Sequence, residues 1–380
     1  MTRTFKEDLD FLKKHVPTIV LTDGKEGRLA VVPGYQGRVM TSTLNGDEGT
    51  SFGWVNRDLI GSGQTLANFN PYGGEDRFWL GPEGGQFSLF HKPGGPFTLD
   101  NWVVPKPIDT MPFQLKEQTD STAAFEAHLT VTNYSGTQFR INVNRTIKML
   151  TPEEDAGLLG LDNIGNLKIV GFESENHIVN AGDSSWRKDK GLVSVWVLGM
   201  FSPSNNVTII IPFFQGGEGA LGPVVNDKYF GKVPPDRLKI SGGVILFSGD
   251  GKYRSKIGLN WERAKDVLGS YDEDQDVLTV IQYNKPEEEL PYVKSMWEIM
   301  KNPYEGDVIN SYNDGPASPG ARPMGPFFEI ETSSPVKELK PGEELVHVHR
   351  TFHIQGSEPE LNRVCEKLFG INLRDVAEAM

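Results

Sequence analysis

The stretch AFEAHLTV, residues 124–131, decides the fold class of this chain. Apolar side chains occupy its odd positions from Phe125 to Val131, and polar side chains occupy the even positions between them. Because successive side chains of a β-strand point to opposite faces, this alternation is typical of a half-buried strand in an antiparallel sheet. The stretch therefore predicts a sheet that has one face in a core and the other in solvent.

Segments with a similar strand texture recur along most of the 380 residues. They alternate with turn residues, and the 42 Gly and 25 Pro indicate many turns and hence many short strands. No βαβ rhythm of a parallel sheet is present, so we expect one large antiparallel β-sandwich rather than tandem domains. Further strands are predicted over residues 28–33, 87–90, 139–149, 167–173, 192–201, 207–214, 243–247, 278–283, 327–331 and 345–354.

Helices are predicted mainly at the two ends of the chain. Residues 4–15 form one, with Thr4 as the N-cap and a glutamate three residues later. A short helix is expected over residues 286–300, and a last one over 358–369, which Gly370 ends. The predicted organisation is an N-terminal helix in 1–17, a β-sandwich domain in 18–356, and a C-terminal helix in 357–380 packed on the same domain.

The composition excludes several classes of protein. The formal net charge of −13 is a poor match for nucleic-acid phosphates or anionic lipid surfaces. A single cysteine, Cys365, excludes an intramolecular disulfide. The longest apolar runs fall far short of the roughly 18 residues that a membrane span needs. The N-terminus has no apolar signal-peptide core, so we expect a cytoplasmic protein, or a periplasmic or extracellular one if a signal peptide has been removed.

No nucleotide-binding or zinc-protease motif occurs in the sequence. The phosphate loop, the dinucleotide fingerprint, HExxH and GxSxG are all absent. Kinases, dinucleotide enzymes, zincin proteases and α/β-hydrolases are therefore not expected, and no cofactor is predicted.

The first candidate site is a pair of C-terminal strands, FFEIET and LVHVHRTFHI. Glu329 and Glu331 share one face of the first strand, and His347, His349 and His353 share one face of the second. This polar surface has three interpretations: a solvated outer face, a metal site, or a sugar-binding acid–base face that includes His349. We expect no tightly held metal, because imidazoles about 6.5–7 Å apart on one strand need a third ligand from elsewhere.

The second candidate is the glycine-rich loop NPYGGEDRFWLGPEGGQF, residues 70–87. It combines Glu75, Arg77 and Trp79, and an aromatic ring with charged groups on a rigid loop is the chemistry that sugars require. The indole stacks on sugar C–H groups, while the charged groups bind vicinal hydroxyls. The alternative is a structural loop in which Arg77 pairs with a neighbouring carboxylate.

Four short motifs occur in a fixed order over most of the chain. They are Asn56-Arg57, Gly73-Gly74, Asn176-His177, and Glu331-Thr332 before a proline. In this order the motifs resemble those of the galactose mutarotase-like family, the aldose 1-epimerases and their relatives. The resemblance covers about residues 25–355 and implies a large antiparallel β-supersandwich with short flanking helices.

The resemblance also implies a reaction, the ring opening of an aldose. Glu331 would take the proton of the anomeric hydroxyl, His177 would protonate the ring oxygen, and Arg57 would hold sugar hydroxyls. A carboxylate and an imidazole can exchange protons in both directions near neutrality. We therefore expect His177 and Glu331 to converge on one cleft that the loop 70–87 also lines.

Two other functions remain open, because Tyr72 stands where the family has a histidine before the paired glycines. One is a non-catalytic carbohydrate-binding or accessory protein with the same fold. The other is a glycoside hydrolase that uses two carboxylates, which would be chosen from Glu75, Asp76, Glu83 and Glu331. In each case the expected partner is a small-molecule sugar or an oligosaccharide, with no nucleic acid. The sequence does not decide the oligomeric state.

Overall fold

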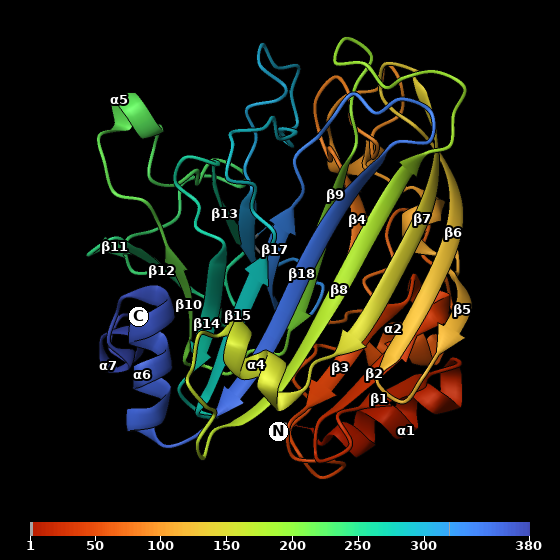
Figure 1. Ribbon diagram of the computed structural model, residues 1–380. Helices are drawn as coiled ribbons and strands as arrows, with labels where there is room; N and C mark the ends of the chain where they lie inside the picture. The colour runs from red at the N-terminus through yellow and green to blue at the C-terminus, as the bar shows by residue number, and fades with distance from the viewer. Residues whose placement is uncertain (1–2, 319) are drawn as a thin grey trace.

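The computed structural model describes residues 3–318 and 320–380, which form three antiparallel sheets (Figure 1). The small sheet contains β1 (Ile19–Thr22), β2 (Arg28–Val32) and β3 (Arg38–Thr43). In spatial order, the five-stranded sheet contains β13 (Ser255–Leu259), β16 (Ile309–Asn313), β17 (Phe328–Ser333), β9 (Ser194–Phe201) and β4 (Arg77–Gly81). In the same way, the ten-stranded sheet contains β11 (Leu238–Ser241), β12 (Val244–Ser248), β10 (Val207–Pro212), β14 (Val267–Asp272), β15 (Val277–Tyr283), β18 (Glu344–Gln355), β8 (Lys168–Asn180), β7 (Gln138–Met149), β6 (Thr122–Thr132) and β5 (Gln114–Gln118). The predicted mainly antiparallel β fold is confirmed.

Short helices accompany the sheets. They are α1 (Phe5–His15), α2 (Arg57–Ser62), α3 (Lys106–Asp109), α4 (Pro152–Leu158), α5 (Glu218–Leu221), α6 (Glu358–Phe369) and α7 (Leu373–Ala377), with 3₁₀ turns at Pro33–Tyr35 and Leu99–Asn101. Both predicted terminal helices are present: Thr4 forms the capping box of α1, and Gly370 ends α6 with a φ of +73°. In the described part of the chain, no helix is both long and apolar enough to cross a membrane.

The hydrophobic core fills the space between the two large sheets. Phe78 of β4 and Val197 of β9 pack against Phe125 of β6 and Val143 of β7 from the opposite sheet. A second cluster lies on the other face of the ten-stranded sheet, where α6 and α7 cover β10 and β14. Over β6 to β8, every second residue of that face is partly or fully exposed. The five-stranded sheet packs one face, with Phe78 and Val197, into the core between the sheets, so its other face is available for a site.

Two predicted elements are wrong, and a third has a different end. Residues 286–300 contain no helix, because Pro291 lies inside the segment and a proline breaks a helix interior. Residues 87–90 form turns rather than a strand, with the Leu89 amide donating to the Pro82 carbonyl. The strand predicted to end at residue 173 continues as β8 to Asn180.

Candidate functional site

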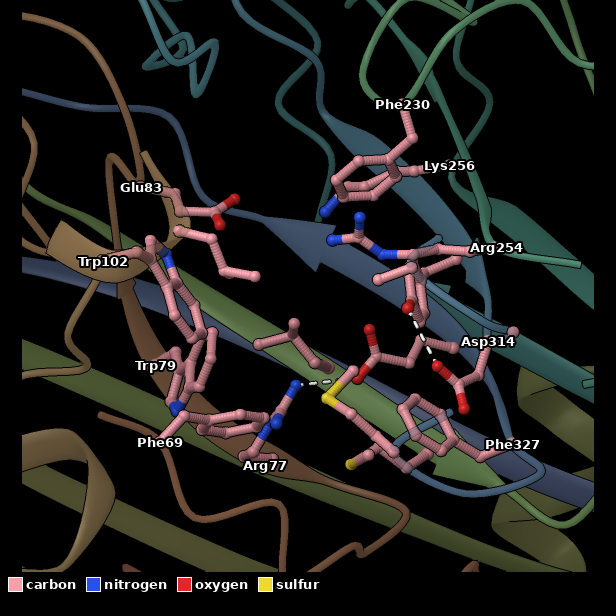
Figure 2. Close-up of a pocket in the computed structure, with 18 of the residues that line it drawn as sticks. Phe69, Arg77, Trp79, Glu83, Trp102, Phe230, Arg254, Lys256, Asp314 and Phe327 are labelled. Carbon is pink, nitrogen blue, oxygen red and sulfur yellow. Dashed lines mark hydrogen bonds and ion pairs between the residues drawn. The ribbon is translucent and has the colours of Figure 1, made fainter. Parts of the chain in front are cut away.

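A cavity of about 180 Å³ lies over the outer face of the five-stranded sheet. Figure 2 shows Trp79, Trp102 and Glu83 on one side of it and Lys256 and Asp314 on the other. Tryptophans form a large part of its wall, so we call it the tryptophan pocket. It brings together segments that are far apart in the sequence, and no local motif contains it.

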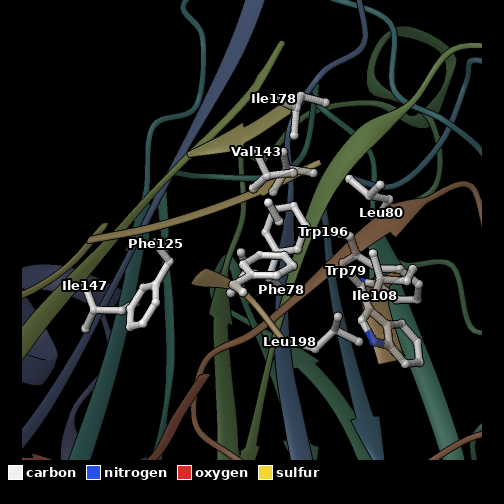
Figure 3. Close-up of a cluster of buried hydrophobic side chains, with 14 of the residues drawn as sticks. Phe78, Trp79, Leu80, Ile108, Phe125, Val143, Ile147, Ile178, Trp196 and Leu198 are labelled. Atoms are coloured by element: carbon white, nitrogen blue, oxygen red, sulfur yellow. The ribbon is translucent and has the colours of Figure 1, made fainter. Parts of the chain in front are cut away.

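Strand alternation places the side chains of the pocket. On β4, Phe78 and Leu80 point into the core between the sheets (Figure 3), so Arg77 and Trp79 point the other way, into the pocket. On β17, the same alternation directs Glu329 to the pocket. The polar residues of these strands therefore face a cavity and not bulk solvent.

Four of the seven tryptophans of the chain line the pocket. The rings of Trp79 and Trp196 meet edge to face with centroids 5.5 Å apart, and Trp102 stacks on Trp297 at 6.3 Å. Aromatic side chains combine a large apolar surface with a polar N–H group. The wall can therefore bind the apolar C–H face of a ring that also carries hydroxyl groups.

Two ion pairs form the floor of the pocket. Arg77 Nη2 donates to Glu329 Oε1 at 2.8 Å, and Lys256 Nζ donates to Glu331 Oε2 at 3.0 Å. The indole Nε1 of Trp196 donates to the same Glu331 oxygen at 3.0 Å. Glu329 lines the cavity directly, whereas Glu331 is fully buried behind Lys256 and Trp196. Glu331 thus lies beneath the pocket and Glu329 at its surface.

Burial shifts the proton equilibria of the pocket. It raises the pKa of the Glu329 carboxyl to about 7, and it also raises the pKa of Glu83. For Lys256, burial lowers the pKa, but the nearby carboxylates of Glu331 and Glu83 outweigh burial and raise it overall. Glu329 and Glu83 therefore hold a proton more readily than exposed carboxyl groups do, while Lys256 remains charged.

Several buried polar atoms around the pocket have no hydrogen-bond partner among the described residues. They are Arg77 Nε and Nη1, Trp79 Nε1, Trp102 Nε1 and Glu331 Oε1. A buried donor or acceptor without a partner costs about 1–3 kcal/mol. A ligand with several hydroxyl groups would remove part of that cost.

The loop 70–87 contributes to the pocket in part. Arg77, Trp79 and Glu83 line it, and Arg77 pairs with Glu329 from a distant strand rather than with a neighbour in the loop. The roles of Arg77 and Trp79 in sugar binding remain predictions.

The expectation that His177 and Glu331 share a cleft is wrong. Because β8 runs without a break through this region, Asn176 points into the interior and His177 points out from the ten-stranded sheet. His177 Nδ1 lies 3.0 Å from Glu344 Oε2, and its Nε2 lies 2.7 Å from Glu175 Oε1. His177 therefore cannot act as the acid opposite Glu331.

Arg57 also lies away from the pocket. It begins α2, where its Nη1 pairs with Asp8 at 2.8 Å and its guanidinium covers the Phe11 ring at 4.3 Å. These contacts tie α2 to the N-terminal helix. The predicted contact between Arg57 and a sugar is therefore not possible at this site.

Glu75 and Asp76 belong to an interior polar layer, which we define as Glu75, Asp76, Arg145, Thr332, His347, His349 and His353. Glu75 accepts hydrogen bonds from Ser42 Oγ at 2.9 Å and pairs with His353 Nε2 at 2.8 Å. Asp76 pairs with Arg145 at 2.5 Å, and both are fully buried. Neither carboxylate reaches the pocket, which removes both from the hydrolase hypothesis and Glu75 from the sugar-binding set.

His349 lies in the same layer and not on a solvated face. β17 and β18 belong to different sheets, and Thr332 Oγ1 bridges His347 Nε2 and His349 Nδ1 at 2.8 Å each. Burial lowers the pKa of His347 to about 3 and that of His349 to about 4, so both imidazoles are neutral. Among the described residues, no group of three His, Cys, Asp or Glu side chains could hold a metal ion.

Sequence reasoning missed much of the pocket. Glu329 had a signal, because it shares a strand face with Glu331, which the family resemblance had singled out. Lys256, Trp102, Trp196 and Trp297 had none, because each comes from a different segment and only the folded sheet brings them together.

The fold is that of the galactose mutarotase-like proteins, as comparison with solved structures shows. The Slr1438 protein from Synechocystis sp. PCC 6803 superposes with a TM-score of 0.51 at 12% identity, over 90% of this chain and 96% of that one. A galactose mutarotase-like protein from Lactobacillus casei gives 0.51 at 10% identity, over 89% and 100%.

The sequence itself defines a narrower group. The chain belongs to the family of unknown function DUF6786, which matches residues 3–380. No curated protein matches it in sequence. At this low identity, the structural likeness establishes the fold alone.

Proposed function

We propose that this protein binds a sugar in the tryptophan pocket and interconverts its anomers or epimers by acid–base ring opening. The observation that carries the proposal is a carboxyl group, Glu329, at the surface of a pocket walled by four tryptophans. The indoles would stack on the C–H face of a pyranose, and Arg77 would hold its hydroxyls. The galactose mutarotase-like fold is consistent with a carbohydrate ligand.

In the proposed reaction, Glu329 is the base. Its carboxylate accepts the proton of the anomeric hydroxyl, the bond between the anomeric carbon and the ring oxygen breaks, and Glu83 protonates that oxygen. The open aldehyde rotates. As the ring closes, Glu83 takes its proton back from the attacking hydroxyl, and Glu329 returns its proton to the carbonyl oxygen. A general base is most effective when its pKa lies near the working pH, and the pKa of Glu329 is about 7.

Glu331, which the family resemblance assigns as the base, has a supporting role in this proposal. Its contacts with Lys256 and Trp196 hold a fixed positive charge beside the pocket. That charge would stabilise negative charge that develops on the sugar oxygens.

Exchange between the anomers of a panel of aldoses, followed by NMR, tests the proposal. The Glu329→Gln variant keeps the shape of the side chain but removes the proton acceptor, so exchange should slow by about 10²–10⁴-fold. The matched control is Glu175→Gln on the outer face beside His177, which should leave the exchange rate unchanged. Unchanged exchange in Glu329→Gln would refute the assigned base.

A second candidate function is non-catalytic sugar binding. It is favoured by the absence of histidine among the described residues that line the pocket, since the resemblance implies a histidine acid. Measurable binding without anomer exchange for any sugar would decide for this function.

A further inference from the structure

We infer that the tryptophan pocket carries an anion subsite in which Arg254 binds a negatively charged group of the sugar. The inference rests on the proposed function, since it names the class of sugar that the same pocket would take. An acidic sugar, with a carboxylate or a phosphate group, would be its ligand.

The position of Arg254 supports this subsite. It immediately precedes β13, two residues before Lys256, so both side chains lie on the pocket face of the strand, roughly 6.5–7 Å apart along the backbone. Figure 2 shows the guanidinium of Arg254 and the ammonium of Lys256 directed into the same pocket. Two adjacent cations therefore face the space that a ligand would occupy.

The two cations differ in how they are neutralised. Lys256 pairs with Glu331 at 3.0 Å. Arg254 has no carboxylate oxygen within 4.0 Å among the described residues. In a chain with a net charge of −13, a half-buried arginine without a counter-ion is unexpected on charge alone.

Asp314 is the pocket carboxyl group that could have neutralised Arg254, but its oxygens are engaged elsewhere. Oδ1 accepts from the Tyr312 hydroxyl at 3.0 Å, and Oδ2 accepts from the Gly325 amide at 3.0 Å. Burial also raises the pKa of Asp314, which weakens its charge further. Arg254 thus keeps most of its positive charge available to a ligand.

The guanidinium of Arg254 is held in place by an aromatic ring. Its central carbon lies 3.8 Å from the centroid of the Phe230 ring. Stacking on an aromatic face leaves the in-plane N–H groups free, and these match a carboxylate or phosphate with two parallel hydrogen bonds. Arg322, exposed at the rim of the same pocket, adds a second charge of the same sign.

Titration calorimetry with three sugars of one ring type tests the inference. The probes are glucose, glucuronate and glucose 6-phosphate, measured at low and at physiological salt. At least one charged sugar should bind about 10–100-fold more tightly than glucose, as expected for a hydrogen-bonded charge pair. Preference for glucuronate assigns a carboxylate ligand, and preference for glucose 6-phosphate assigns a phosphate.

Two variants locate the effect. Arg254→Gln should abolish the preference for the charged sugar, lowering the affinity for that sugar far more than the affinity for glucose. Lys252→Gln, which removes a positive charge from the same loop outside the pocket, should keep the preference. Retained heat-denaturation midpoints would show that both variants are folded.

The outcomes separate this inference from the proposed function. If glucose and both charged sugars bind equally, or if Arg254→Gln keeps the preference, the anion subsite is refuted while sugar binding stands. If none of the three probes binds and no aldose shows exchange, both proposals fail.

Discussion

The tryptophan pocket and the interior polar layer both bury charged groups, but they use them differently. In the layer, Asp76 and Arg145 are fully buried, and Arg145 also donates to the Asn176 side chain. In the pocket, the pair of Arg77 and Glu329 lies at the surface of a cavity, and two nitrogens of Arg77 have no partner within the described residues. Asp76 Oδ2 and His349 Nε2 in the layer also have no partner within the described residues, but they lie between the sheets, whereas Arg77 borders a cavity that a ligand could enter.

The largest expected difference between the two regions concerns stability. Asp76→Asn keeps the shape of the side chain but leaves the buried charge of Arg145 without a counter-ion, so the free energy of unfolding should fall by about 3–5 kcal/mol. Glu329→Gln also takes the carboxylate from Arg77, but it should cost less than Asp76→Asn, because this pair borders a cavity and burial already favours the neutral form of the Glu329 carboxyl. Urea unfolding of the two variants measures both values, and equal losses would show that the pocket is as structural as the layer.

Strand alternation explains what the sequence could predict. It located β6 and β18 and the shared face of Glu329 and Glu331, because these depend only on neighbours along one strand. It could not tell which face of a strand lies inside. A solvated surface was one interpretation of the histidine face of β18. In the structure this face packs between the sheets, because α6 covers the apolar face on the other side of the strand.

The site was less predictable for a related reason. The predicted position of His177 assumed that the strand ends before this residue. Because β8 continues to Asn180, strand alternation places the His177 side chain on the outer surface of the sheet and not in the expected cleft. The pocket itself depends on five strands and several separate loops meeting, so it leaves no periodic signal in the sequence. Arg77 and Trp79 were predicted as pocket residues only because one short segment combines the aromatic and charged side chains that are typical of sugar-binding sites.

The response to pH should also separate the two regions. The pKa values of His347 and His349 lie below the usual 6.5, so their contribution to stability is complete above pH 6.5 and is lost as the pH falls towards 4. Glu329 has the opposite effect on stability, because its pKa is higher in the folded state than the usual 4.5. The stability that it contributes is complete below pH 4.5 and is lost as the pH rises through about 7. Anomer exchange should rise over the same interval, because the base must be ionised.

His349→Asn tests the stability part of this expectation. Between pH 6.5 and 4, the decline in unfolding free energy should become shallower by up to about 1.4 kcal/mol per pH unit. His128→Asn, at an exposed histidine, is the control and should leave the slope unchanged. A slope that is the same in His349→Asn and in the native protein would show that His349 is not held neutral in the fold.

The smallest expected effect belongs to His177, and it bears most directly on how the site was assigned. His177→Asn removes an imidazole that lies between Glu175 and Glu344 on the outer face of the ten-stranded sheet, across the sandwich from the pocket. Partly exposed ion pairs contribute about 0–1 kcal/mol, so the unfolding free energy should change by no more than that. The anomer exchange rate should stay within about twofold of the native rate. A loss of exchange of tenfold or more in a folded His177→Asn protein would place the chemistry on the outer face and would overturn the assignment of the tryptophan pocket.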